Sequence, residues 1–222
     1  VEAVRVDVSV TNGNRPVAGL QAGDFELIDN GVPQALDLVE PDRARIAVSL
    51  VLDVSESVSG ERLRHLVAAV TALLNAVGPD DRASLMVFDD DVREPAGETG
   101  DTGALRRSVV HLAPGGRTAL NDAAYAAIAR ATAGDRRRLI VLFSDGFDNA
   151  SWLPREAVVG AARRADAVIY GVAVGYPRGP RLPWHWAMAR SLMEMLASTT
   201  GGLFVTAGGD RDLEPTFLRV IN

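Results

Sequence analysis

The sequence predicts an α/β fold, a doubly wound and mostly parallel sheet with helices on both faces, preceded by a short N-terminal β segment. Residues 46–52 and 139–143 are near-continuous apolar runs, as expected for central strands that are buried on both sides. From residue 46 onward, such runs alternate with segments whose apolar residues recur at helical spacing. We therefore expect a main α/β domain at residues 46–222 and an N-terminal β-strand segment at residues 1–45 that packs on it.

The N-terminal segment reads as strands and turns. Valines alternate with polar residues from Val4 to Val10, which is the period of a half-buried strand. Asn12-Gly13-Asn14 follows as a turn, and residues 25–28 form a second short strand that ends at Asp29-Asn30-Gly31. Residues 34–39 are a candidate third strand. A few short strands rarely fold alone, so we expect this segment to need the main domain.

In the main domain, a helix with an apolar stripe from Leu63 to Val77 is expected to end at Gly78-Pro79 through a glycine C-cap. Residues 176–186 hold too many prolines for a helix and are interpreted as an ordered insertion. The other expected strands are residues 83–88, 92–94, 167–174 and 203–205, of which 92–94 and 203–205 are edge strands. The other expected helices are residues 103–112, 119–131, 154–165, 191–198 and 213–221.

Composition excludes several function classes. The chain of 222 residues has no Cys, which excludes disulfides, thiolate zinc sites and cysteine nucleophiles. A net charge of −6 argues against nucleic acid, which needs a concentrated basic face. No apolar stretch reaches the roughly 20 residues that span a bilayer. No signal peptide stands at the start, and we expect any targeting segment to have been removed.

Oxygen-bearing side chains follow both buried strands. Asp53, Ser55 and Ser57 come after the first strand, and Asp145 comes after the second. Thr118 lies between them in the chain, before an Ala-rich helix. In open α/β sheets, ligands bind beyond the carboxyl ends of the strands where the strand order reverses, so we expect these residues to share one site.

This donor set suits a hard divalent cation. It contains two carboxylates and three hydroxyls, with no imidazole and no thiolate. Mg²⁺, Mn²⁺ and Ca²⁺ prefer such oxygens, and Mg²⁺ is favoured if the cage is small and octahedral. Two carboxylates neutralise the ion, while neutral hydroxyls and water leave it open positions. A carboxylate from another molecule would be a strong further ligand.

The same residues resemble a known family. Asp53-x-Ser55-x-Ser57 matches the D-x-S-x-S motif that opens the metal-ion-dependent adhesion site of von Willebrand factor A domains. Thr118 looks like the family's threonine ligand, and Asp145 looks like its second aspartate. The resemblance covers about residues 46–222. It implies a Rossmann-like fold and a Mg²⁺-dependent, non-catalytic module that binds a protein partner through a carboxylate. In the family, some of these residues contact the metal directly and the rest act through water.

Three further residues are expected at the rim of the ligand site: Glu56, Gly116 and Gly146. Glu56 departs from the family, because many adhesion-type members have a small residue at this position. A carboxylate there could repel an acidic partner, or cap the metal of a neighbouring molecule.

The N-terminal segment has a second resemblance. Val6 to Thr11 and Asp24 to Gly31 are similar to the segment that precedes the A domain in a group of bacterial von Willebrand A-related proteins. These proteins are generally predicted to be exported. The resemblance therefore implies an extracytoplasmic location, either secreted or periplasmic.

The residues alone are also compatible with other functions. Asp53 could be the nucleophile of a Mg²⁺-dependent phosphohydrolase, although Ser55 stands where such enzymes usually carry a second Asp, and the chain has no Lys to orient a phosphate. The metal could also be purely structural, in a domain that serves as an assembly part. The alternative without a metal site is that Asp53 and Asp145 are ordinary helix N-caps.

Several other polar and aromatic residues lie outside the main set. The three histidines, His65, His111 and His185, share no ligand spacing. Asp148 and Asn149 form a turn or rim the site. Residues Trp184 and Trp186 cover the end of the sheet or form a recognition patch.

Overall fold

The computed structural model divides the chain into two compact units, Val1–Ala44 and Arg45–Asn222. The structure describes residues 6, 8, 10–12, 15–17, 19–36, 45–131, 134–145, 147–174 and 184–207. Within these ranges, no helix is long and apolar enough to cross a membrane. The packing of the N-terminal segment on the main domain stays a prediction.

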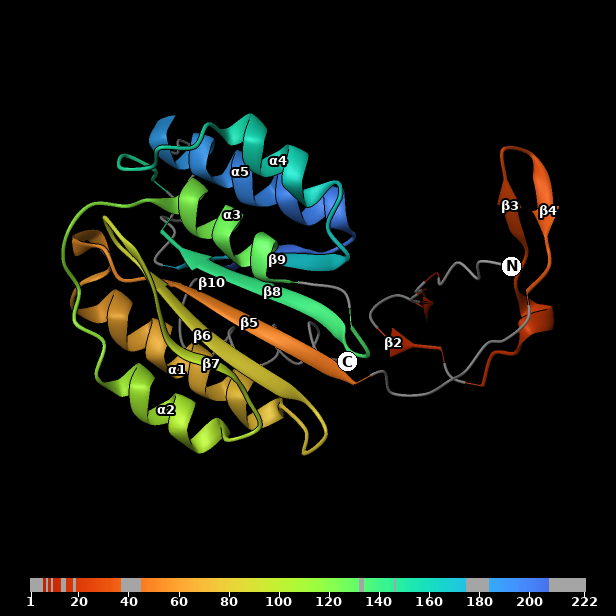
Figure 1. The fold of residues 1–222 in the computed structure, drawn as a ribbon, viewed down its shortest axis with the longest axis horizontal. Coiled ribbons are helices and arrows are strands. Elements are labelled where there is room, and N and C mark those ends of the chain that lie inside the picture. The colour runs from red at the N-terminus through yellow and green to blue at the C-terminus, as the bar shows by residue number, and fades with distance from the viewer. Residues whose placement is uncertain are drawn as a thin grey trace. The chain divides into compact units, whose positions relative to one another are not determined.

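The larger unit contains a six-stranded sheet in the order β10-β9-β8-β5-β6-β7 (Figure 1). Neighbouring strands are parallel except for β7, which runs antiparallel to β6 at one edge. The strands are β5 (Ile46–Asp53), β6 (Arg82–Phe88), β7 (Val92–Thr99), β8 (Arg137–Ser144), β9 (Ala167–Val174) and β10 (Phe204–Ala207). The predicted mostly parallel sheet and both predicted edge strands are confirmed.

Helices cover both faces of this sheet, as predicted (Figure 1). The helices α1 (Glu61–Ala76) and α2 (Thr102–Val110) lie on one face. On the other face lie α3 (Leu120–Arg130), α4 (Arg155–Ala162) and α5 (Trp184–Thr200). A single 3₁₀ turn, η2 (Glu56–Val58), joins β5 to the start of α1.

The central strands are buried on both faces, which explains their near-continuous apolar sequence. Leu50 and Leu52 pack in the core under α1, whereas Val51 packs in the core under α3, and all three are 0% exposed. Each such side chain contributes about 1.5–3 kcal/mol by leaving water. Two separate apolar cores therefore hold β5 and its neighbour β8 in place.

The order in which the chain adds strands to the sheet reverses between β5 and β8. From β5 it continues to β6 on one side and later returns to β8 on the other. Leu52 pairs with Phe143 in the parallel ladder, so the residues that follow them, Asp53 and Ser144, lie together at the edge formed by the carboxyl ends of the strands. This edge is the switch point at which open α/β sheets bind their ligands.

Two sequence interpretations of the main domain need correction. The helix α1 ends at Ala76 with Val77 as an extended C-cap (φ −65°, ψ 121°), and no left-handed glycine follows it. Gly78 precedes Pro79, which disfavours helical geometry at this position, and it donates its N–H to Asp81 Oδ2 at 2.9 Å. The helix α5 begins at Trp184, which lies inside the predicted insertion; residues 175–183 and the predicted helix 213–221 lie outside the described part.

The smaller unit contains short antiparallel pairs. In the hairpin of β3 (Leu27–Asp29) and β4 (Val32–Gln34), Asn30 and Gly31 have φ values of 48° and 82°, the geometry of a type I′ turn. The strands β1 (Thr11–Asn12) and β2 (Arg15–Pro16) form the other pair. The strand predicted from Val4 to Val10 is absent at its described positions 6, 8 and 10, since the ladder of β1 and β2 begins at Thr11; the Val10 carbonyl accepts the N–H of Val17 at 2.9 Å just before it.

Candidate metal centre

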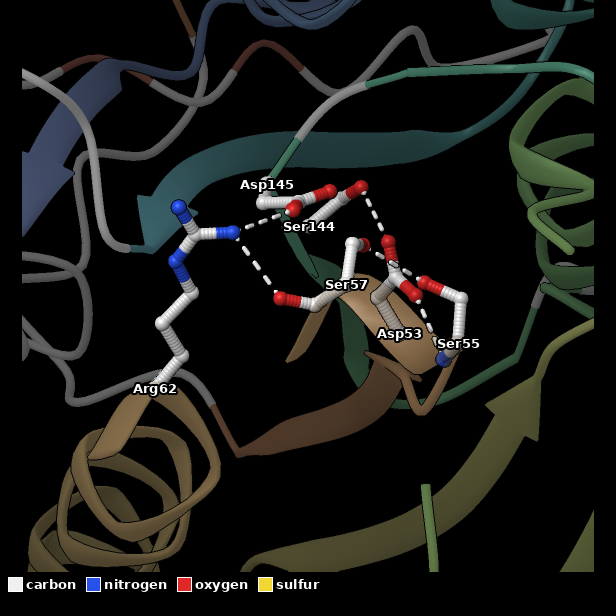
Figure 2. Close-up of polar contacts among 6 residues, drawn as sticks. All are labelled: Asp53, Ser55, Ser57, Arg62, Ser144 and Asp145. Atoms are coloured by element: carbon white, nitrogen blue, oxygen red, sulfur yellow. Dashed lines mark hydrogen bonds and ion pairs between the residues drawn. The ribbon is translucent and has the colours of Figure 1, made fainter. Parts of the chain in front are cut away.

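Asp53 anchors the site at the end of β5. Its Oδ1 accepts the N–H of Ser55 at 2.9 Å, and its Oδ2 accepts the hydroxyl of Ser144 at 2.6 Å (Figure 2). The residue is 1% exposed. Burial raises the pKa of Asp53 from 3.8 to about 6; hydrogen bonds from Ser144 and Ser55 oppose this rise, and the negative charge of Asp145 adds to it. The carboxylate is thus held in place while its charge remains poorly compensated.

The two serines of the β5–α1 loop lie side by side. The Oγ atoms of Ser55 and Ser57 are 3.0 Å apart (Figure 2). This distance suits a hydrogen bond between them. It is also about the separation of two adjacent ligands on an octahedron with metal–oxygen bonds of ~2.1 Å, the length that Mg²⁺ prefers. The pair can therefore bind one small cation without moving apart.

A glycine loop brings the threonine to the same place. Gly115 donates its N–H to the Val54 carbonyl at 2.9 Å, and the Gly116 carbonyl accepts the N–H of Glu56 at 3.1 Å. Gly116 has a φ of 74°, and a Cβ there would lie 2.3 Å from an Asp90 carboxylate oxygen. Only glycine fits this position without rearrangement, which explains part of the Gly-Gly sequence.

Thr118 is held by the loop that follows β8. Its N–H donates to Asn149 Oδ1 at 2.8 Å, and its carbonyl accepts the N–H groups of Asn149 and Ala150 at 3.0 and 3.1 Å. The residue is 4% exposed and lines the same cleft as Ser55, Ser57 and Asp145. Three segments that are distant in sequence thus converge on one point.

Asp145 has one oxygen in an ion pair and one oxygen that no described residue contacts by a hydrogen bond. Its Oδ2 accepts a hydrogen bond from Arg62 Nη1 at 3.0 Å, and the same Nη1 donates to the Ser57 carbonyl at 2.9 Å (Figure 2). Its Oδ1 is buried and has no hydrogen-bond partner within the described chain. A buried carboxylate oxygen without a partner is unfavourable, and a bound cation would satisfy it.

Ser55, Ser57, Thr118 and Asp145 line a cleft of about 630 Å³, and Asp53, which does not line it, is hydrogen-bonded to Ser55. In the described ranges, no three His, Asp or Glu residues cluster to hold a metal, so any ion here depends on hydroxyl oxygens beside two carboxylates. The orphaned Oδ1 of Asp145, the paired serines and the all-oxygen donor set fit a hard divalent cation. The cleft is lined by Ser55, Glu56, Ser57, Arg62, Gly116, Arg117, Thr118, Asp145, Phe147 and Asn149.

The structure thus brings the five predicted ligands together at one edge of the sheet. Two of the predicted rim residues, Glu56 and Gly116, line the cleft, whereas Gly146 lies outside the described residues. Neither aspartate caps the helix that follows it, because Gly60 occupies the N-cap of α1 and Pro154 that of α4.

The sequence interpretation missed two contacts. Ser144 supports Asp53, and its position at the end of a buried strand was a usable signal. Arg62 pairs with Asp145 across 83 positions of sequence, which no local pattern reveals. Asn149 rims the cleft and accepts the N–H of Thr118, which agrees with the second of its two interpretations. The side chains of residues 184–191, including those of Trp184 and Trp186, lie outside the described part.

Comparisons with known proteins place these observations in context. Residues 48–147 match the sequence profile of a family described as "von Willebrand factor type A domain". Comparison with curated proteins gives no match.

Solved structures share the fold. An aerotolerance-related membrane protein from Bacteroides fragilis is 19% identical, with a TM-score of 0.64 over 80% of this chain and 98% of that chain. The von Willebrand factor domain of the type V pili tip protein Mfa5 from Porphyromonas gingivalis is 16% identical, with a TM-score of 0.61 over 80% and 94%. Proximal thread matrix protein 1 from the mussel byssus, solved with a zinc-occupied MIDAS motif, is 18% identical, with a TM-score of 0.62 over 81% and 46%.

Proposed function

We propose a function from the premise that this chain contains, at residues 48–147, a domain of the von Willebrand factor type A family. The domain is a non-enzymatic binding module that holds a divalent cation, Mg²⁺ first among the candidates, and uses it to bind an acidic group of a protein partner. The proposed ligands are Asp53, Ser55, Ser57, Thr118 and Asp145.

The observation that carries the proposal is the buried Oδ1 of Asp145, which has no hydrogen-bond partner in the described chain. It lies in the same cleft as the hydroxyl pair of Ser55 and Ser57, whose oxygens are already spaced as adjacent ligands. When bound, a divalent cation supplies a Lewis-acidic centre for an anionic oxygen. The chain's part is to hold these oxygens at the open mouth of the cleft.

The residues divide this task by their burial. Asp53 is fixed by Ser55 and Ser144 at the base, where it supplies negative charge with little freedom to move. Ser57 is exposed, so the site opens to solvent on its side. A partner's carboxylate can approach from that side, past the exposed Glu56.

The relatives support this function without showing it for this chain. One of them carries zinc in its MIDAS motif, and another is a domain of a pilus tip protein. A metal-dependent adhesion or protein-binding role agrees with both. The pilus protein and the membrane protein also support the proposed extracytoplasmic location.

A magnesium titration tests the proposal. Calorimetry or a thermal melt on the wild type should show saturable binding, and Asp53→Ala should abolish it. A displayed random-peptide library should then enrich acidic peptides on the Mg²⁺-loaded protein, and EDTA should release them. Peptides retained in EDTA would point to a structural metal and an assembly role instead.

The exposed Glu56 refines this test. Its carboxylate lies on the cleft and adds negative charge where an acidic ligand would enter. Peptides selected on the wild type should bind the Glu56→Ala variant at least as tightly as they bind the wild type. Weaker binding would show that Glu56 contacts the partner favourably.

A further inference from the structure

Arg62 stands at the rim of the proposed cation site. Its Nη1 donates both to Asp145 Oδ2, at 3.0 Å, and to the Ser57 carbonyl, at 2.9 Å (Figure 2). Both acceptors belong to proposed metal-ligand residues, and Arg62 lines the same cleft as they do. The guanidinium therefore occupies the neighbourhood in which a cation would be held.

The charge of Arg62 explains how Asp145 tolerates burial without a metal. The Asp145 side chain is only 6% exposed, and a buried carboxylate is costly without a positive partner. The Arg62 ion pair supplies that partner. It also leaves Asp53, Asp145 and Arg62 with one net negative charge instead of two, which weakens the attraction of the site for a divalent cation.

Arg62 can leave this position without a backbone change. It is the second residue of α1, and its side chain is 38% exposed. The positive end of the helix dipole lies in this first turn and disfavours a cation there. The partly exposed side chain can therefore turn toward solvent by rotation about its own bonds.

We propose, on the basis of the function proposed above, that Arg62 competes with the cation for Asp145 and so sets the cation affinity of the site. In the metal-free protein, the Arg62–Asp145 ion pair neutralises the buried carboxylate. Cation binding displaces Arg62 from Asp145. In the alternative arrangement, Arg62 orients Asp145 so that Oδ1 faces the site. Removing Arg62 would then weaken cation binding, whereas competition predicts that it strengthens cation binding.

Calorimetric titration of Mg²⁺ into three proteins tests the proposal: the wild type, Arg62→Gln and Arg64→Gln. Arg64 is an exposed arginine on the same helix, so its substitution removes the same charge outside the site. We expect Arg62→Gln to bind Mg²⁺ roughly 10-fold more tightly, because a nearby positive charge is removed. Arg64→Gln should stay within about 2-fold of the wild type because solvent screens its charge.

Thermal melts in EDTA give a readout that needs no metal. Arg62→Gln should lower the melting temperature, because it leaves Asp145 buried without its counter-charge. In the Asp145→Asn background the same substitution should have little effect. Arg64→Gln should be neutral in both backgrounds.

The outcomes separate the two proposals. Equal or weaker Mg²⁺ binding by Arg62→Gln, with binding by the wild type intact, overturns the competition and supports an orienting role. An absence of Mg²⁺ binding in both the wild type and Arg62→Gln overturns the proposed function and this inference with it. Tighter binding by Arg62→Gln together with a lower melting temperature in EDTA supports both.

Discussion

Replacing Asp53 by Asn should stabilise the metal-free protein, and excess metal should remove most of this difference from the wild type. The carboxylate of Asp53 is 1% exposed, and its pKa is raised from 3.8 to about 6, mainly by burial. At pH 7 it is ionised in both the folded and the unfolded chain. Its charge therefore costs the metal-free folded state about 3 kcal/mol, at ~1.4 kcal/mol for each unit of pKa.

Asparagine removes this charge and keeps the local contacts. Its Oδ1 can still accept the N–H of Ser55. Its amide N–H can donate to the Ser144 hydroxyl oxygen, which is the donor in the wild type and becomes the acceptor in the variant. We expect Asp53→Asn to stabilise the metal-free protein by up to about 3 kcal/mol. For a domain of this size, that corresponds to a rise of about 6–12 °C in melting temperature.

Bound metal offsets most of this advantage of the variant. A cation at 100 times its dissociation constant stabilises the wild type by about 2.7 kcal/mol. Asp53→Asn should lose this gain, because the site retains one carboxylate instead of two. Mg²⁺ should therefore raise the melting temperature of the wild type and leave that of the variant nearly unchanged.

Thermal melts at pH 7 in EDTA and in excess Mg²⁺ measure both effects. The matched control is Asp135→Asn, because Asp135 is an exposed carboxylate in a long 3.8 Å ion pair with Arg45, just before β8. The control should change stability by less than about 1 kcal/mol in either buffer. If Asp53→Asn is less stable than the wild type in EDTA, the argument from burial is refuted.

The remaining predictions concern pH, the loop, the threonine and catalysis. Because the folded-state pKa of Asp53 is raised, its contribution to metal-free stability is fully present below pH 3.8 and is lost as pH rises to about 6, so urea unfolding in EDTA should show a fall over this window that Asp53→Asn lacks. Gly116→Ala should cost about 1–2 kcal/mol through its left-handed backbone and weaken Mg²⁺ binding, whereas Gly115→Ala, whose Cβ meets nothing within 4 Å, should do neither. Thr118→Ala should weaken Mg²⁺ binding in calorimetry and Thr118→Ser should restore it; equal binding by all three proteins would remove Thr118 from the ligand set. A generic phosphate ester with Mg²⁺ should show no turnover, and turnover abolished by Asp53→Asn would make the protein an enzyme.

Much of the fold follows from local sequence signals. The apolar runs that became β5 and β8 contain a single polar residue, Ser49, so their burial between two helical layers was predictable. The positions of α1 to α4 were predictable to within a few residues from helical periodicity. The prediction was wrong where local rules compete, as at the end of α1, where Pro79 and Asp81 decide the geometry instead of a glycine cap.

The candidate ligands were also accessible from sequence, because the carboxyl ends of β5 and β8 must meet if the two strands are neighbours. The motif types at those ends then indicated the chemistry of a hard cation. The sequence did not show that Asp53 is a fixed carboxylate at the bottom of the site, nor how far apart the Ser55 and Ser57 hydroxyls lie. They depend on the turn that follows β5 and on its backbone hydrogen bonds to the Gly115-Gly116 loop.

The sequence by itself determined which elements form and which residue types stand at the ends of the central strands, because hydrophobic periodicity and turn chemistry act over short stretches of chain. Only the tertiary structure decided that Arg62 pairs with Asp145, that Ser144 supports Asp53, and that one carboxylate oxygen stays buried without a partner in the described chain. These contacts join residues that are distant in sequence. Their charges and burial depend on the packing of the whole sheet, which no short stretch of chain specifies.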